Sequence, residues 1–248
     1  VGFSHGVMNT DNMSLLGLTI DYGPFGFMEA FDPGHICNHS DNEGRYAFNQ
    51  QPQVGLWNLA CLAQALSPLL PEAEADALLE TYAPEFNASY IRLMGAKLGL
   101  REASEQDVPL VITLLERLRD SRLDYSNFFR DLGEFSTAPG ADNSRLRDRF
   151  ADPLAFDAWA ADYRQRLQRD GDGDAGRKAR MDAVNPKYIL RNHLAQAAIE
   201  RAERERDFSE IDRLRSLLAR PFDDQPGMER YAAPPPEGAP RIEVSCSS

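Results

Sequence analysis

The sequence has few cysteines, a deficit of basic residues and no long apolar run. Three cysteines among 248 residues are too few for a disulfide scaffold and suit a reducing compartment. Lysine and arginine number 27 against 39 aspartates and glutamates, giving a net charge of −12. This balance argues against a surface that binds nucleic-acid phosphates, where basic patches dominate affinity. No stretch approaches the roughly eighteen apolar residues of a transmembrane helix, so we expect neither nucleic-acid nor membrane partners.

Two clusters of side-chain oxygens lie near the N-terminus. Residues 5–12 read H-G-V-M-N-T-D-N, the apolar run 13–20 follows, and Asp21 opens D-Y-G-P-F-G. This pattern predicts a short β-hairpin that brings Asn12 and Asp21 together. Carboxylate and amide oxygens are the hard ligands that Mg²⁺ prefers, with water and nucleotide phosphates completing the shell. Asn12 and Asp21 are therefore the predicted metal ligands, for Mg²⁺ or alternatively Mn²⁺.

The spacing of this region resembles the catalytic core of protein kinases, with one change. A kinase loop H-R-D-x-x-x-x-N supplies the catalytic base and a metal-binding Asn, and a later D-F-G supplies the main metal-binding Asp. His5 and Asn12 keep the first spacing, residues 21–23 resemble the second motif, and Val7 stands at the position of the base. Because valine cannot accept a proton, we predict that Asp11 is the general base.

Longer motifs carry a more specific resemblance. They are H-G-V-M-N-T-D-N-M-S from His5, D-Y-G-P-F-G-F-M from Asp21, N-H-S-D-N-E-G-R-Y-A-F-N-Q-Q-P-Q-V-G-L-W over residues 38–57, and the terminal C-S-S. Together they resemble the selenoprotein O family, kinase-like proteins that transfer AMP from ATP to protein hydroxyls. The resemblance implies ATP as co-substrate, with Asp21 at the nucleotide, and Ser, Thr or Tyr residues of proteins as acceptors. An ordinary protein kinase and an inactive kinase-like scaffold stay open as alternatives.

The resemblance also implies a redox-sensitive pair of cysteines. Family members carry a cysteine or selenocysteine just before a terminal Ser-Ser, and it pairs with the cysteine downstream of D-Y-G. In this sequence the two residues are Cys246 and Cys37. An exposed thiol in a tail exchanges readily, so such a bond would act as a switch. From the residues alone, two free thiols are the alternative, and a zinc site at Cys37 is disfavoured because no fourth ligand cluster exists.

The chain begins at Val1, only a few residues before the predicted catalytic loop. A nucleotide-transfer enzyme needs a glycine loop that cradles the phosphates and a basic residue that binds them. In the family, the nucleotide-binding lobe precedes this stretch. We therefore expect a C-terminal fragment that is inactive alone, from a cytoplasmic protein of bacterial type. A targeting signal in a preceding segment stays open.

The rest of the chain has helical periodicity, interrupted by loops. Residues 29–53 form a long, turn-rich loop in which Arg45 is a candidate functional charge or a structural ion-pair partner. Residues 170–176 contain G-x-G-x-x-G but follow no buried strand, so we expect a flexible surface turn and not a dinucleotide site. Helices are expected at residues 54–66 and 71–79, around 86–98, at 104–118 and 153–169, from Asn185 with Pro186 in its first turn, and at 209–220.

The predicted fold is mainly α with a small β component (α+β), comparable to the C-terminal lobe of a protein kinase. Residues 1–53 would carry the catalytic and metal-binding loops, including the β-hairpin of the metal site. Residues 54–220 would form the helical remainder of the same domain, a helical bundle. Residues 221–248 would form an extended proline-rich tail that ends in Cys246.

Overall fold

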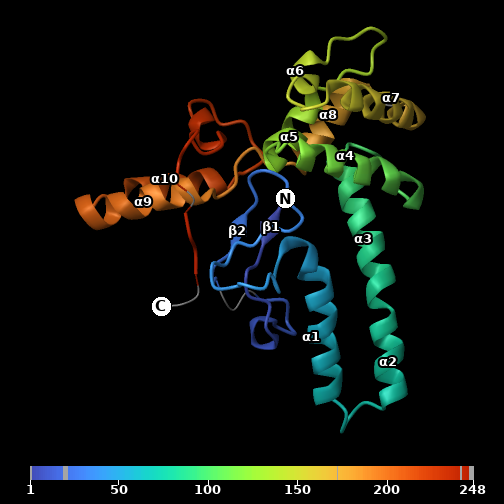
Figure 1. Ribbon diagram of the computed structural model, residues 1–248, viewed down its shortest axis with the longest axis vertical. Coiled ribbons are helices and arrows are strands. Elements are labelled where there is room, and N and C mark those ends of the chain that lie inside the picture. Colours follow the sequence, from blue (N-terminus) through green and yellow to red (C-terminus); the bar gives the residue numbers. More distant parts are fainter. Residues whose placement is uncertain (1, 19–21, 172, 241, 246–248) are drawn as a thin grey trace. The chain divides into compact units, whose positions relative to one another are not determined.

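A computed structural model describes residues 2–18, 22–171, 173–240 and 242–245 (Figure 1). The chain is mainly helical, as predicted, and its strands Phe3–Ser4 (β1) and Gly26–Phe27 (β2) form a two-stranded sheet. Within the described residues, no helix combines the length and the apolar character that crossing a membrane requires.

The predicted helices at 54–66, 71–79, 86–98, 104–118, 153–169 and 209–220 are confirmed, with shifted ends. The α-helices are α1 Gln51–Ala65, α2 Glu72–Glu80, α3 Tyr82–Lys97, α4 Val108–Asp120, α5 Tyr125–Asp131, α6 Ser144–Arg147, α7 Pro153–Asp170, α8 Asp174–Asp182, α9 Asn192–Glu205 and α10 Ser209–Leu218. The 3-10 helices are η1 Thr10–Asn12, η2 Phe48–Gln50, η3 Glu105–Asp107, η4 Leu132–Glu134 and η5 Glu229–Tyr231.

The chain divides into two compact units. The larger unit consists of Val1–Gly2, Phe27–Phe31 and Ile91–Ile242, and the smaller unit of Phe3–Gly26, Asp32–Tyr90 and Glu243–Ser248. The smaller unit therefore contains the predicted catalytic loop, most of the turn-rich loop, α1, α2 and the C-terminal end of the chain.

The core of the larger unit is built from aromatic side chains of α5 and α7. Phe128 and Phe129 of α5 and Phe156 and Tyr163 of α7 are buried. The ring of Trp159, also buried, stacks on Tyr163 with 4.8 Å between the ring centroids. Phe150 lies between the two helices, with its ring centroid 5.5 Å from that of Phe128 and 4.8 Å from that of Phe156. Complete burial of such a side chain stabilises a fold by roughly 1.5–3 kcal/mol, so this cluster contributes much of the stability of the larger unit.

The expected helix from Asn185 is wrong, because α9 begins only at Asn192. The side chain of Asn185 is fully buried and caps no helix; it accepts a hydrogen bond from Lys97 Nζ (2.8 Å) and donates one to the Lys97 carbonyl (2.9 Å). The backbone N–H groups of Lys187 and Tyr188 donate to the Pro221 carbonyl at 2.8 and 3.1 Å. Tertiary hydrogen bonds thus replace the helical ones that the Asn-Pro signal predicts.

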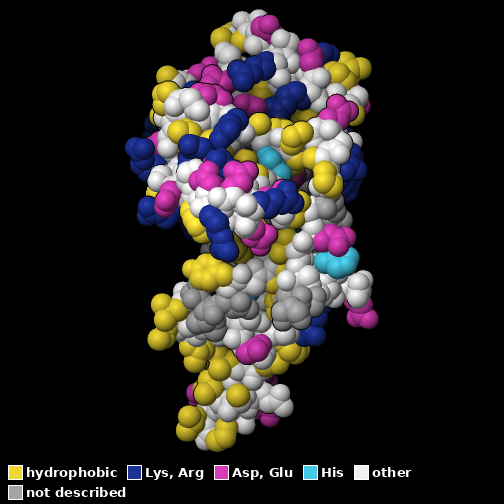
Figure 2. Space-filling view, turned by 90° about the vertical axis from the view of Figure 1, so that its left-hand side faces the viewer, with side chains coloured by type: hydrophobic (Ala, Val, Ile, Leu, Met, Phe, Trp, Pro, Cys, Tyr) yellow, Lys and Arg dark blue, Asp and Glu magenta, His cyan; other side chains and the backbone are white. Residues whose placement is uncertain are grey.

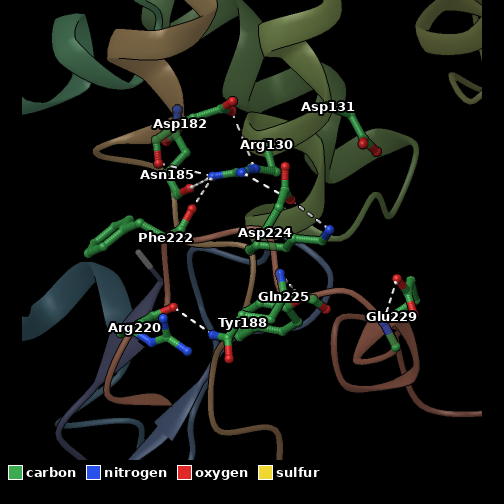
Figure 3. Close-up of polar contacts among 12 residues, drawn as sticks. Arg130, Asp131, Asp182, Asn185, Tyr188, Arg220, Phe222, Asp224, Gln225 and Glu229 are labelled. Carbon is green, nitrogen blue, oxygen red and sulfur yellow. Dashed lines mark hydrogen bonds and ion pairs between the residues drawn. The ribbon is translucent and has the colours of Figure 1, made fainter. Parts of the chain in front are cut away.

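Arg130 of α5 fixes the same segment from a second side (Figure 3). Its Nη1 donates to three backbone carbonyls, those of Asp182 (3.0 Å), Asn185 (3.2 Å) and Phe222 (3.0 Å). An Arg guanidinium has five donors in a rigid fork, which suits it to several carbonyls at once. Residues 185–191 are thereby held as a buried extended connection in the centre of the larger unit.

Arg191, at the end of that connection, has only 1% of its side chain exposed. It donates to Asp124 Oδ2 at 2.7 Å and also to the carboxylate of Glu29. Because Glu29 belongs to Phe27–Phe31, the stretch that follows the D-Y-G motif, Arg191 ties this stretch to α5 and α9. Buried charges of this kind are tolerated only when they are paired and hydrogen-bonded.

The predicted surface turn at residues 170–176 is shorter than expected. Asp170 ends α7 and Asp174 begins α8. Both carboxylates are engaged: Asp170 accepts from the Arg101 backbone (2.9 Å), and Asp174 accepts from the backbone and hydroxyl of Thr137 (2.9 and 2.8 Å). The aspartates of this stretch that the structure describes are therefore anchors between elements.

Candidate active site

Asp11 and Asn12, the predicted base and the first predicted metal ligand, lie on η1 of the smaller unit. The backbone N–H of Asn12 donates to the Asn9 carbonyl at 3.0 Å and closes this tight turn. The side chain of Asp11 is exposed, whereas that of Asn12 is half-buried. The turn thus presents a carboxylate to solvent beside an amide, which is the arrangement that a proton acceptor next to a metal ligand needs.

The backbone before η1 is held by polar side chains of α1. Gln51 accepts from the His5 N–H (2.9 Å) and donates to the Phe3 carbonyl (3.1 Å). About two turns further along the helix, Asn58, 5% exposed, donates to the Met8 carbonyl at 3.0 Å. These contacts fix the loop before any ligand arrives, as catalytic preorganisation requires.

Sequence reasoning missed these supporting residues. The available signal was an amide at helical spacing from small or apolar residues: Asn58 shares a face of α1 with Val54 and Gly55, and these three are the buried residues of that helix. A polar residue on a buried face needs a partner, and here the partner is the backbone of the predicted catalytic loop. Tyr46, whose hydroxyl donates to Asn9 Oδ1, adds a further support from the turn-rich loop.

A glycine is required at position 6. Gly6 has a φ of +84°, and a Cβ built there would lie 2.6 Å from the Pro24 carbonyl oxygen and 2.9 Å from Cys37 Sγ. Both the left-handed backbone and the lack of space exclude a side chain. The close approach brings the Cys37 thiol against the loop, where it donates to the Pro24 carbonyl at 2.9 Å.

Cys37 is a free thiol, and burial raises its pKa to about 11. Since the thiolate is the species that attacks disulfides, the thiol is a slow nucleophile at neutral pH. Its predicted partner, Cys246, lies outside the described residues, so the pair stays a prediction.

The end of the chain is nevertheless attached next to Cys37. Val244 forms a parallel β-bridge with Asn38, and its carbonyl accepts from the His39 N–H at 2.7 Å. The hydroxyl oxygens of Ser40 and Ser245 lie 2.5 Å apart. Val244 and Ser245 are therefore bound to the three residues that follow Cys37.

The structure does not test the predicted hairpin or the second metal ligand in full. Asp21 lies outside the described residues, so its approach to Asn12 stays a prediction. The described residues of the apolar run, 13–18, contain no strand, and the sheet is formed instead by β1 and β2 on either side of the run. Leu15 and Leu16 expose 79% and 81% of their surface, so nothing within the described chain gives this run a buried face.

No group of three or more His, Cys, Asp or Glu side chains that could hold a metal exists among the described residues. The predicted pair, one Asn and one Asp, is not a group of that kind. Its oxygen donors match a hard divalent cation, which in nucleotide sites is held by one or two protein groups and the phosphates.

Exposed apolar side chains gather on the smaller unit. Besides Leu15 and Leu16, these are Leu66, Leu69 and Leu78 around the junction of α1 and α2, with 37%, 84% and 61% of their surface exposed. Figure 2 shows hydrophobic side chains gathered around this junction.

The family model and the similar proteins point to the same family. The family model described as protein adenylyltransferase SelO matches residues 1–219. The protein nucleotidyltransferase YdiU of Myxococcus xanthus is 58% identical over 248 residues, covering 100% of this chain and 51% of the relative. The corresponding proteins of Thioalkalivibrio sulfidiphilus and Cupriavidus metallidurans are 58% and 53% identical, over 100% of this chain and 51% and 48% of their own lengths. The chain thus spans about half the length of the curated relatives it matches.

Proposed function

Because the chain belongs to the protein adenylyltransferase SelO family, we propose that it supplies the catalytic loop of an enzyme that transfers AMP from ATP to Ser, Thr or Tyr hydroxyls of proteins. The observation that carries the proposal is the exposed carboxylate of Asp11 on a turn whose preceding backbone is fixed by Gln51 and Asn58. A base needs access to its substrate and a fixed position, and this turn provides both.

In the proposed reaction, Asp11 accepts the proton of the acceptor hydroxyl as its oxygen attacks the α-phosphorus of ATP. A bond forms between that oxygen and the α-phosphorus, and the bond from the α-phosphorus to the bridging oxygen breaks. Pyrophosphate leaves with the electron pair, and AMP stays on the acceptor. Val7 has no group that could accept the proton, which disfavours the base position of an ordinary kinase.

Asn12 and Asp21 would hold Mg²⁺ or Mn²⁺, with Asp21 also at the nucleotide. When bound, such an ion neutralises charge on the phosphate oxygens. The support for this assignment is the donor chemistry, an amide and a carboxylate oxygen, together with the half-buried position of Asn12 beside the exposed Asp11.

We infer a kinase-like C-terminal lobe in three parts: catalytic loops at 1–53, a helical remainder at 54–220 and a tail at 221–248. The exposed Leu15 and Leu16, next to the proposed metal ligands, support the view that activity needs a further polypeptide segment over this surface. The chain alone would then be inactive. A cytoplasmic enzyme that acts on proteins, and not on nucleic acids or membranes, fits its net charge of −12.

Regulation by a bond between Cys37 and Cys246 is part of the proposal. It is supported by the attachment of Val244 to Asn38, which holds the chain two residues before Cys246 beside the residue after Cys37. The bond would form slowly, because burial keeps the Cys37 thiol protonated at neutral pH with a pKa of about 11.

Intact-mass spectrometry tests the proposal. A chimera in which this chain replaces the matched half of the Myxococcus xanthus relative is incubated with ATP and Mg²⁺ and an acceptor protein. The proposal expects an added AMP that is lost in Asp11→Ala and retained in Thr10→Ala, an exposed neighbour on the same turn. An added phosphate would establish the kinase alternative, and bound ATP without any transfer would establish the scaffold.

A further inference from the structure

A pocket of about 640 Å³ opens in the smaller unit between the turn-rich loop and the start of α1. The side chains that matter for its chemistry are Ile36, Glu43, Arg45, Gln53, Val54 and Trp57. Ile36 and Val54 supply apolar surface, whereas Arg45, Glu43 and Gln53 supply polar groups. Ligand-binding pockets in proteins are usually preformed and contain a small number of polar groups that point toward the ligand.

Arg45 is the one cation among the described residues that line this pocket. Its guanidinium lies over the ring of Trp57, 4.7 Å from the centroid, and 5.5 Å from the centroid of Tyr46. In the part of the chain that the structure describes, Arg45 forms no ion pair. It is therefore not the structural ion-pair partner that the sequence left open. Aromatic faces hold a cation in place while leaving its N–H donors available for an anion.

The loop that carries Arg45 is rigidly built. The carboxylate of Asp41 accepts from the backbone N–H of Arg45 (2.9 Å) and from that of Tyr46 (2.8 Å). The backbone from which the Arg45 side chain extends is thus fixed by two hydrogen bonds. A fixed guanidinium loses less conformational entropy on binding than a side chain of a free loop.

The residue after Arg45 contacts the proposed catalytic loop. Tyr46, under the Arg45 guanidinium, donates its hydroxyl proton to Asn9 Oδ1, and Asn9 precedes Asp11 by two residues. The turn that carries Arg45 is therefore linked to the loop of the proposed base by a hydrogen bond.

We propose that this pocket docks the acceptor polypeptide and that Arg45 receives an Asp or Glu side chain close in sequence to the modified hydroxyl. The side-chain amide of Gln53, which makes no hydrogen bond within the described chain, has both a donor and an acceptor for the backbone of an extended peptide. Trp57, 44% exposed, supplies an apolar face for a neighbouring side chain. The proposal rests on the proposed adenylyl transfer and names its substrate preference.

Glu43 lines the same pocket and gives the proposal an internal check. The Glu43 carboxylate repels an acidic ligand. Removal of the Glu43 charge should therefore strengthen binding of an acidic peptide, whereas removal of the Arg45 charge should weaken it. Both residues are exposed, and a general defect in folding would lower binding in both variants.

The test uses two peptides that share one acceptor serine and differ only by Glu or Gln two residues away, with the chimera described above. Peptide binding without ATP is followed by the fluorescence anisotropy of a dye attached to the peptide, because Arg45 lies over the Trp57 ring and its replacement would itself change the tryptophan signal. We expect Arg45→Gln to raise the Kd and KM for the Glu peptide about tenfold, with kcat unchanged, and to abolish the difference between the two peptides. Glu43→Gln should lower both constants for the Glu peptide, and Arg215→Gln on α10 should change nothing.

Equal constants for the Glu and Gln peptides in the wild-type chimera would overturn the proposal. Loss of ATP affinity in Arg45→Gln would also overturn it, since the pocket would then belong to the nucleotide. If the labelled Glu peptide binds selectively but no peptide receives AMP, the docking site stands and the proposed transfer fails.

Discussion

Lys97 should make the stability of the larger unit depend on pH, and Lys97→Met should remove that dependence. The ammonium group is 7% exposed and has no ion-pair partner in the described chain; it donates to Asn185 Oδ1 and lies 4.2 Å from the ring centroid of Phe129. Burial lowers its pKa from 10.5 to about 7. Between pH 7 and pH 10.5, Lys97 carries a proton in the unfolded chain but not in the folded chain. The free energy of unfolding therefore rises with pH over this range.

The size of the effect follows from the two pKa values. Integrating the difference in bound protons from pH 7 to pH 9 gives the wild type a gain of about 2 kcal/mol over the Met variant. Methionine has a similar shape and leaves Asn185 Oδ1 without its donor, which costs roughly 1–3 kcal/mol. That cost is the same at each pH, so it shifts the curve without changing its slope.

Urea unfolding at several pH values measures this difference. The chain has two tryptophans, so a Trp57→Phe background leaves Trp159 of α7 to report on the larger unit. Lys187→Met is the matched control, because its pairing with Asp224 raises the pKa of Lys187 and keeps it protonated in both states between pH 7 and 9. A constant difference between wild type and Lys97→Met across this range would refute the reasoning.

Three further predictions concern the backbone, a buried charge and a thiol. Gly6→Ala should destabilise the smaller unit by more than the roughly 1–2 kcal/mol of a left-handed backbone, whereas Gly17→Ala, with a φ of +68° and no atom within 4 Å of a new Cβ, should cost only that amount in thermal denaturation. Arg191→Met should cost about 3–5 kcal/mol, because the buried Asp124 carboxylate loses its cation; a loss below 1 kcal/mol in urea unfolding would contradict this. Iodoacetamide should label Cys37 about a hundredfold more slowly than a free cysteine peptide at pH 7.5, with a rate that rises about tenfold per pH unit, since its pKa is about 11; equal rates would exclude a buried thiol.

Local signals in the sequence predicted most of the helices. Apolar periodicity located α1 to α4, α7 and α10, and the capping box at Ser104 and Asp107 is present, with Asp107 accepting from the Ser104 N–H at 2.9 Å. Signals of this kind depend on neighbours within one turn, so they can be recognised without knowing the fold.

The segment from Asn185 could not be predicted in this way. The Asn-Pro pair has the form of a helix start, but its hydrogen bonds go to Lys97 and to the carbonyl of Pro221, both distant in sequence. The same limit applies to the candidate site: the motif predicts roles for Asp11 and Asn12, whereas the support that Gln51 and Asn58 give the loop was found only from their contacts in the structure.

The most direct test of the central claim is to follow the two ends of the ATP triphosphate separately. The chimera that contains this chain is incubated with an acceptor protein and ATP labelled either on the α-phosphate or on the γ-phosphate. The proposed transfer predicts that the α-label becomes bound to the acceptor, that the γ-label is released in pyrophosphate, and that Asp11→Ala loses both events. A γ-label on the acceptor would contradict adenylyl transfer.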